Sequence, residues 1–214
     1  MHVLTDNWST YWHGFLGTLW LTMVSAALAL VLGAAVAGFR VSPVKPLRVF
    51  GTGWVTVLRN TPLTLLFFIV VLGLPRFDIT LPFFTFAVLA LGCYTSAFVC
   101  ETLRSGVNTV PVGQGEAARS LGLTFTQTLG LVILPQAYRA VVAPLGSVMI
   151  ALAKNTAIAG SFSVVELLGT YRTLNELGYG IVWTFVWIAV GYLVLTLAIS
   201  ALFNLLERRV AVSR

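Results

Sequence analysis

The sequence predicts an all-α, polytopic membrane protein with five transmembrane helices. Of its 214 residues, 58% are hydrophobic and only 9% are charged, whereas a soluble domain carries roughly 25% charged residues. The apolar residues gather in runs of about 18 or more, the length that a helix needs to cross about 30 Å of hydrocarbon. The net charge of +6 is carried by residues that flank these runs, so it indicates orientation in a membrane and not binding to nucleic acid.

The apolar runs follow one another with short breaks. We expect spans over residues 14–39, 49–74, 81–103, 137–159 and 181–206. Gly73 and Pro75 mark the turn after the second span, and Gly178 and Gly180 precede the last. Residues 104–136 are too polar to lie in hydrocarbon, so they are expected to form a loop in water. Residues 1–214 are therefore expected to form a single transmembrane domain. The N-terminus lacks the basic region and the cleavage site of a signal peptide, so the first apolar run is expected to be retained.

The basic residues that flank the spans fall almost entirely on one side of a five-span arrangement. Only Arg76 and Arg172 fall on the other side. By the positive-inside rule, the N-terminus is outside, whereas the C-terminus and the loop 104–136 are cytoplasmic. The basic residues on the cytoplasmic side are Arg40, Lys45, Arg48, Arg104, Arg119, Arg139, Arg208, Arg209 and Arg214.

Small residues recur in the first span at every fourth position, namely Ser25, Ala29, Gly33 and Ala37. This spacing lets helices approach closely in lipid, either within the bundle or against a second subunit. Cys93 and Cys100 lie on one face of the third span but about 10 Å apart, beyond disulfide reach. With no histidine nearby, they are interpreted as small packing residues and not as metal ligands.

A short surface helix is predicted inside the loop 104–136, from Glu116 to Leu121. Ala117 and Ala118 would give it a smooth side, Leu121 an apolar knob, and Gly122 a left-handed cap. The groove of a partner protein could hold such a helix and transmit force to the fourth span. The alternative is an ordinary surface helix between two spans.

Three charged residues are expected within or beside the spans. Pro62 to Leu74 measures only about 20 Å as a helix, so the second span must include Arg59 and Thr61. The same estimate of helix length places Lys154, Asn155 and Thr156 at depth in the membrane or at the mouth of a cavity. Charges persist there when they face water, a partner charge or a substrate. The alternatives are structural ion pairs or snorkelling toward headgroups. For Glu101 the alternative is a surface pair with Arg104.

Several motifs resemble one family. The run Gln114–Gly122, closed by Val132–Pro135, resembles the cytoplasmic coupling loop of bacterial ABC importer permeases. Arg59–Leu63 resembles the Arg-Gly-Thr-Pro-Leu element of the polar amino-acid uptake permeases. The variants at Arg40–Lys45, Arg59–Pro62 and Lys154–Thr156 look most like actinobacterial glutamate-uptake permeases. The other matching segments are Phe98–Gly106, Leu134–Ala137, Pro144–Gly146 and Leu152–Thr156.

The resemblance implies a type I ABC importer permease in the bacterial plasma membrane. It implies an ABC ATPase dimer, a second, related permease subunit and an extracytoplasmic solute-binding protein as partners, with an amino acid as substrate. The ATPase-coupling residues would be Glu116, Ala117, Ala118, Leu121 and Gly122. The substrate-binding residues would be Arg59, Thr61, Glu101, Lys154, Asn155 and Thr156.

Glutamate is the expected substrate. Many relatives carry Asp at the position of Asn155, and the absence of that carboxylate beside Lys154 makes the site more hospitable to an anion. Glutamine, aspartate and a cationic amino acid stay open as alternatives, because the solute-binding protein normally fixes much of the specificity.

Other classes of function are less consistent with the sequence. No phosphate-binding loop of the Gly-x-x-x-x-Gly-Lys-Ser/Thr type occurs, so ATP hydrolysis is assigned to partner subunits, and neither enzymatic activity nor a cofactor is expected. His2 and His13 have no partners for catalysis or metal binding. An ion-coupled carrier or channel is the alternative from a different class, although no buried carboxylate pair or repeated half supports it.

Overall fold

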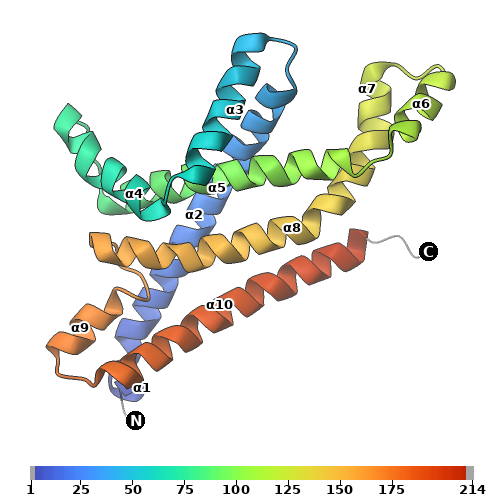
Figure 1. Cartoon of the computed structure of the whole chain (residues 1–214). Helices are drawn as coiled ribbons and strands as arrows, with labels where there is room; N and C mark the ends of the chain where they lie inside the picture. Colours follow the sequence, from blue (N-terminus) through green and yellow to red (C-terminus); the bar gives the residue numbers. More distant parts are fainter. Residues whose placement is uncertain (1–2, 211–214) are drawn as a thin grey trace.

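The computed structural model describes residues 3–210, and every regular element in that range is a helix. Figure 1 shows long helices that run between two opposite ends of the molecule. One end carries α1 and α9, and the other carries α6, α7 and the end of α10. The elements are α1 (Val3–Asp6), α2 (Trp8–Val41), α3 (Lys45–Asn60), α4 (Leu63–Phe68), η1 (Ile69–Gly73), η2 (Leu74–Phe77), α5 (Phe83–Asn108), α6 (Val112–Ser120), α7 (Phe125–Gln127), η3 (Thr128–Ile133), α8 (Leu134–Asn155), η4 (Thr156–Phe162), α9 (Thr170–Glu176) and α10 (Ile181–Val210).

Within residues 3–210, four continuous helices are long and apolar enough to span a membrane: α2, α5, the run 125–162 and α10. A fifth span is formed if α3 and the helical segment Leu63–Phe77 count together, although they are bent by 107°. The expected second span, 49–74, is therefore two helices and not one straight helix. Thr61 is extended (φ −96°, ψ 130°) because it precedes Pro62, and a residue before proline is sterically pushed out of the helical region.

The expected loop 104–136 is largely helical. At its start, α5 continues to Asn108, and at its end the fourth long helix already begins at Phe125. Thr124 starts this helix with a capping box, in which its hydroxyl accepts from the backbone of Gln127 and the Gln127 side chain accepts from the backbone of Thr124. Only the short segments before and after α6, which link it to α5 and to the fourth long helix, are therefore non-helical. Residues 125–136, which mix apolar and polar side chains, are the first part of the fourth long helix and not a loop.

The centre of the bundle is the packing of α2 against α5. Ser25 and Ala29 are fully buried, and a Cβ added to Gly33 would lie 2.6 Å from Cβ of Val99. The stripe of small residues on α2 therefore serves a close approach within this chain, as one of the two expected uses of that spacing requires. Cys100 is buried and Cys93 is half-buried, and both are free thiols that pack in an apolar cluster between these helices.

Candidate functional site

A cluster of charged side chains gathers where α2, α3 and α5 meet. Glu101 of α5 forms an ion pair with Arg40, the second-last residue of α2. The same carboxyl lies 3.3 Å from the guanidinium of Arg104 and 3.9 Å from that of Arg59. Arg59 is close to the end of α3, directly before the bend at Pro62. The break that interrupts the second span thus brings a cation to the carboxyl of a neighbouring helix.

The cluster borders a cavity of about 450 Å³. Three guanidinium groups face one carboxyl group, which leaves an excess of positive charge. The cations differ in how firmly they are held, because the side chain of Arg40 is 17% exposed and that of Arg59 is 46% exposed. An anion could be accommodated here without displacing a buried group. The cavity is lined by Arg40, Val55, Thr56, Arg59, Asn60, Glu101 and Arg104.

A second cavity, of about 290 Å³, lies between α5 and α8. The guanidinium of Arg59 lies 5.6 Å from the ring centroid of Phe98, which lines this second cavity. Arg59 therefore contacts the walls of both cavities, and its attraction to the ring adds to its weak ion pair. Asn155 supplies an amide at the far wall. The lining residues are Tyr94, Thr95, Phe98, Ser147, Val148, Ala151, Leu152 and Asn155.

The other predicted site residues have separate surroundings. Thr61 is half-buried and donates to the carbonyl of Val57 at 2.8 Å, whereas Lys154 is exposed. Thr156 is fully buried, and its hydroxyl donates to the carbonyl of Ala153 at 2.7 Å. The structure therefore brings Arg59 and Glu101 together and places Asn155 in the adjoining cavity. The hydroxyls of Thr61 and Thr156 donate to their own helical turns.

Arg40 is a site residue that the sequence analysis missed. It was counted only as a flanking positive charge, and the surface pair considered for Glu101 involved Arg104 alone. The Glu101–Arg104 pair exists, but the pair with Arg40 joins residues 61 positions apart. Only the packing of α2 on α5 could reveal it.

The helix α6 begins at Val112, earlier than expected, and ends at Ser120. Gly122 has φ of 81°, which confirms the predicted left-handed cap, and the backbone N–H of Leu123 closes it on the carbonyl of Ala118 at 3.2 Å. Leu121 is 83% exposed and Ala117 is exposed, whereas Ala118 is buried. The helix thus offers one apolar, accessible side at its C-terminal end.

The inner face of α6 packs against η3. A Cβ on Gly115 would lie 4.0 Å from Cδ1 of Ile133, which is van der Waals contact. Because η3 continues directly into α8, a push on α6 reaches a membrane-spanning helix through one continuous run of backbone. Figure 1 shows α6 beside the start of this run, away from α9.

A buried carboxyl group, Glu166, was also missed. It is fully buried in the connection between η4 and α9, and it accepts hydrogen bonds from the hydroxyl of Tyr192 at 2.6 Å and from the backbone N–H groups of Leu168 and Gly169. Burial raises the pKa of this carboxyl, although the three donors act in the opposite direction. The available signal was its position between apolar pairs, Val164-Val165 before it and Leu167-Leu168 after it.

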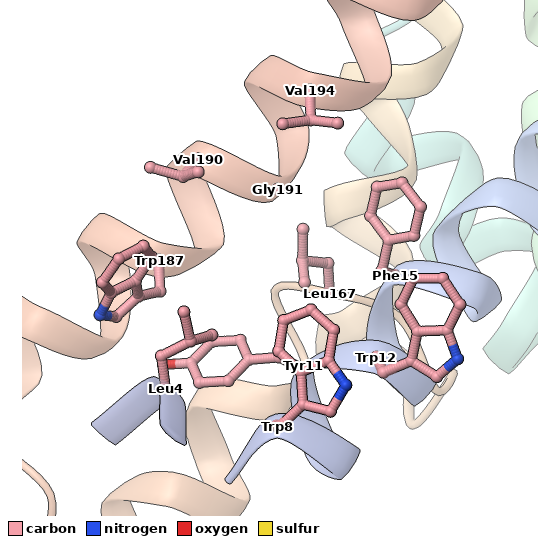
Figure 2. Close-up of a pocket in the computed structure, with 10 residues that line it drawn as sticks. All are labelled: Leu4, Trp8, Tyr11, Trp12, Phe15, Leu167, Trp187, Val190, Gly191 and Val194. Atoms are coloured by element: carbon pink, nitrogen blue, oxygen red, sulfur yellow. The ribbon is translucent and has the colours of Figure 1, made fainter. Parts of the chain in front are cut away.

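An apolar pocket of about 300 Å³ lies between the start of α2 and α10. Figure 2 shows the rings of Trp8, Trp12 and Phe15 along one side and Trp187 and Val190 on the other. Among the described residues that line this pocket, only the Tyr11 phenol is ionisable, so they offer no charge to hold a charged amino acid. The charged cavity around Glu101 and the adjoining cavity between α5 and α8 are the better candidate site.

Known proteins similar to this chain are transport components. The family described as binding-protein-dependent transport system inner membrane component matches residues 29–212. The glutamate transport system permease protein GluC of Corynebacterium glutamicum is 42% identical over 210 residues, 92% of each chain. The probable glutamine ABC transporter permease protein GlnM of Bacillus subtilis is 39% identical over 207 residues, 97% of this chain and 96% of that one.

The fold agrees with this assignment. A chain of the structure described as an amino acid ABC transporter with histidines has a TM-score of 0.92 and 32% identity, with 96% of both chains covered. The type I permease fold expected from the sequence is thereby confirmed. The family implies ATPase subunits and a solute-binding protein as partners. The chain belongs to the inner membrane components of binding-protein-dependent transport systems, as a multi-pass permease subunit of an amino-acid ABC importer.

Proposed function

We propose that this permease carries glutamate into the cell. The observation that supports this substrate is the excess of guanidinium groups over carboxyl groups in the cavity around Glu101. Glutamate has two carboxylates and one ammonium group, so it is a net anion. Arginine is well suited to it, because its planar fork of N–H donors matches a carboxylate with two parallel hydrogen bonds.

Arg59 is the residue that we assign to the substrate carboxylate. Its contact with Glu101 is long, at 3.9 Å, and half of its side chain is exposed, so a substrate can replace that contact at little cost. Its position over Phe98 directs it toward the cavity that contains Asn155. The ammonium group of the substrate would then face Glu101.

The remaining residues of the proposed substrate path are Thr61, Lys154, Asn155 and Thr156. The amide of Asn155 can donate to a carboxylate and accept from an ammonium group. Lys154 adds a positive charge on the same helix end. We infer that Thr61 and Thr156, whose hydroxyls already donate to backbone carbonyls, act by holding the ends of α3 and α8 in shape.

In the proposed orientation, α6 lies in the cytoplasm and the N-terminus lies outside, because the basic flanks favour that side. Glu116, Ala117, Ala118, Leu121 and Gly122 would then form the surface that the ABC ATPase dimer contacts. A second, related permease would complete the path, and the solute-binding protein would deliver the amino acid at the end with α9.

Glutamine is the second candidate substrate, since GlnM is described as a probable glutamine permease. Glutamine differs from glutamate by one carboxylate, so the charge excess around Glu101 discriminates between the two. A cationic amino acid is disfavoured, because its side chain would meet three like charges.

Competition for uptake tests the proposal. The complex of this permease with its partner subunits and solute-binding protein is reconstituted in vesicles, and uptake of labelled glutamate is measured with unlabelled glutamate, glutamine, aspartate or arginine in excess. We expect glutamate to compete most strongly and arginine least. Stronger competition by arginine or glutamine than by glutamate would refute the anionic site.

A further inference from the structure

The connection between η4 and α9 is fixed to the bundle by one buried carboxyl group. Both oxygens of Glu166 are engaged, one by the N–H of Gly169 and the other by the hydroxyl of Tyr192 at 2.6 Å and the N–H of Leu168 at 2.8 Å. Because Tyr192 belongs to α10, the bond to its hydroxyl ties the connection to that helix. Three donors on one carboxyl fill most of its acceptor positions.

The same connection is tied to α2. The hydroxyl oxygen of Thr18 accepts the N–H of Leu167 at 2.9 Å, in a fully buried contact. A Cβ on Gly14 would lie 3.1 Å from Cα of Leu167, and one on Gly17 would lie 3.0 Å from the backbone carbon of Val165. These glycines let the backbone of the connection lie directly on the helix, so α2, α10 and residues 163–169 are held together at this end.

Glu166 also touches the helix that carries the proposed substrate residues. The stretch η4 begins at Thr156, directly after Asn155, and contains Gly160. A Cβ on Gly160 would clash with the Glu166 carboxyl and would lie 2.9 Å from the backbone nitrogen of Gly169. The η4 segment that follows α8 is therefore packed against the Glu166 carboxyl, which bonds Tyr192 of α10, while the neighbouring Leu167 bonds Thr18 of α2.

The long helix is thus held at one end and free to be pushed at the other. Residues 125–162 form one continuous helical run of 38 residues, which curves between α7 and α8 in Figure 1. At its start, η3 packs against α6, which lies beside it in Figure 1, and at its end, Gly160 of η4 lies against the Glu166 carboxyl. If the run 125–162 is pushed at its α6 end and held at its η4 end, it turns about the held end. Without that hold, the run would shift as a whole and would not open the substrate path.

We propose that Glu166 is a positioning residue of the transport cycle. It anchors the outer end of the helix 125–162 to α2 and α10, so that force on α6 tilts this helix and moves Asn155 relative to Arg59. The inference rests on the proposed function, because it assumes that α6 receives the ATPase and that Asn155 and Arg59 contact the substrate.

The test compares transport with ATP hydrolysis in the reconstituted complex. Glu166→Gln keeps the size of the side chain but places an amide N–H₂ opposite an N–H donor, so the anchor loses at least one bond. We expect glutamate uptake per ATP hydrolysed to fall at least tenfold, with ATP hydrolysis within about twofold of wild type. Tyr192→Phe removes one donor only, and we expect a fall of about threefold.

Glu176→Gln is the matched control, because it removes the same charge from an exposed position on α9. It should leave uptake per ATP unchanged. If the Glu166→Gln complex does not assemble, the ratio of uptake to ATP hydrolysis in Tyr192→Phe tests the anchor instead. An unchanged ratio of uptake to ATP hydrolysis in the assembled variants would overturn the anchor, and so would a parallel loss of both activities, which indicates a structural role alone. If wild type itself shows no ATP-dependent uptake of glutamate, the proposed function fails, and not the anchor.

Discussion

The two carboxyl groups at the centre of this account, Glu101 and Glu166, have opposite surroundings. Glu101 is 23% exposed and faces three guanidinium groups on three long side chains. Glu166 is fully buried and faces two backbone N–H groups and one phenol. Long cationic side chains can turn toward another anion, whereas backbone N–H groups cannot move without moving the chain. The first arrangement suits binding and release, and the second suits a fixed joint.

The largest expected difference between the two is in stability. Glu166→Ala leaves three buried donors without an acceptor, which costs about 3 kcal/mol or more of unfolding free energy. Glu101→Ala leaves Arg59 and Arg104, which are nearly half exposed and reach water, and Arg40, which is only 17% exposed, so it should cost less, about 1–2 kcal/mol. Unfolding of the two purified variants in the same detergent measures this difference. Equal losses would show that Glu101 is as fixed as Glu166.

The next largest expected effect concerns substrate binding near Glu101. Arg59→Gln removes the cation that we assign to the substrate carboxylate. A hydrogen bond to a charged group contributes about 1.5–3 kcal/mol, so KM for glutamate uptake should rise by at least about tenfold. Arg76→Gln, at a distant arginine of η2, is the control and should leave KM unchanged. A KM within twofold of wild type for Arg59→Gln would remove this residue from the site.

A smaller expected effect concerns how the connection around Glu166 is attached to α2. Thr18→Val keeps the shape of the side chain but leaves the N–H of Leu167 unpaired, which should cost about 1 kcal/mol of stability. Thr22→Val, one turn further along α2, removes only a bond from its hydroxyl to the carbonyl of Thr18, and should cost much less. The same unfolding experiment compares them. A larger loss for Thr22→Val would contradict the attachment of the connection to α2.

The smallest expected effect comes from adding a carboxyl group near Glu101. Asn155→Asp places a negative charge in the cavity that adjoins Arg59. Glutamate should then bind about threefold more weakly, and arginine should begin to compete, because the excess positive charge is reduced. Competition of labelled glutamate uptake measures both changes, with Asn175→Asp on α9 as the exposed control. Tighter binding of glutamate would reverse the sign of the electrostatic argument.

The sequence predicted the spans well because lipid allows few alternatives to long apolar helices. It did not predict the bend at Pro62, although the proline was noticed, because hydropathy carries no information on direction. It also assigned 125–136 to a loop together with the polar residues before it, although Leu131–Leu134 is apolar and the segment begins a continuous helix. Thr124 and Gln127 carried the capping signal that would have corrected this.

The candidate site was predicted only in part, for a physical reason. Arg59 and Glu101 stood out because charge in an apolar run is expensive. Arg40 did not, because its partner is chosen by the packing of two helices, and a flanking arginine needs no partner to be stable. Glu166 did not stand out either, because an acidic residue in a connection is usually solvated. Its burial depends on glycines of α2 that are far away in the sequence.

In the proposed mechanism, α6 transmits the force of an ATPase to α8 through η3. Gly122→Asp tests it most directly, because φ of 81° at this position favours glycine and the added charge alters the accessible end of α6. Gly113→Asp adds the same charge on the same helix, at an ordinary backbone conformation with open space around it. In reconstituted vesicles, we predict that Gly122→Asp lowers glutamate uptake at least tenfold while ATP hydrolysis stays within twofold, and that Gly113→Asp changes neither by more than about twofold. Undiminished uptake by the assembled Gly122→Asp complex would contradict the account.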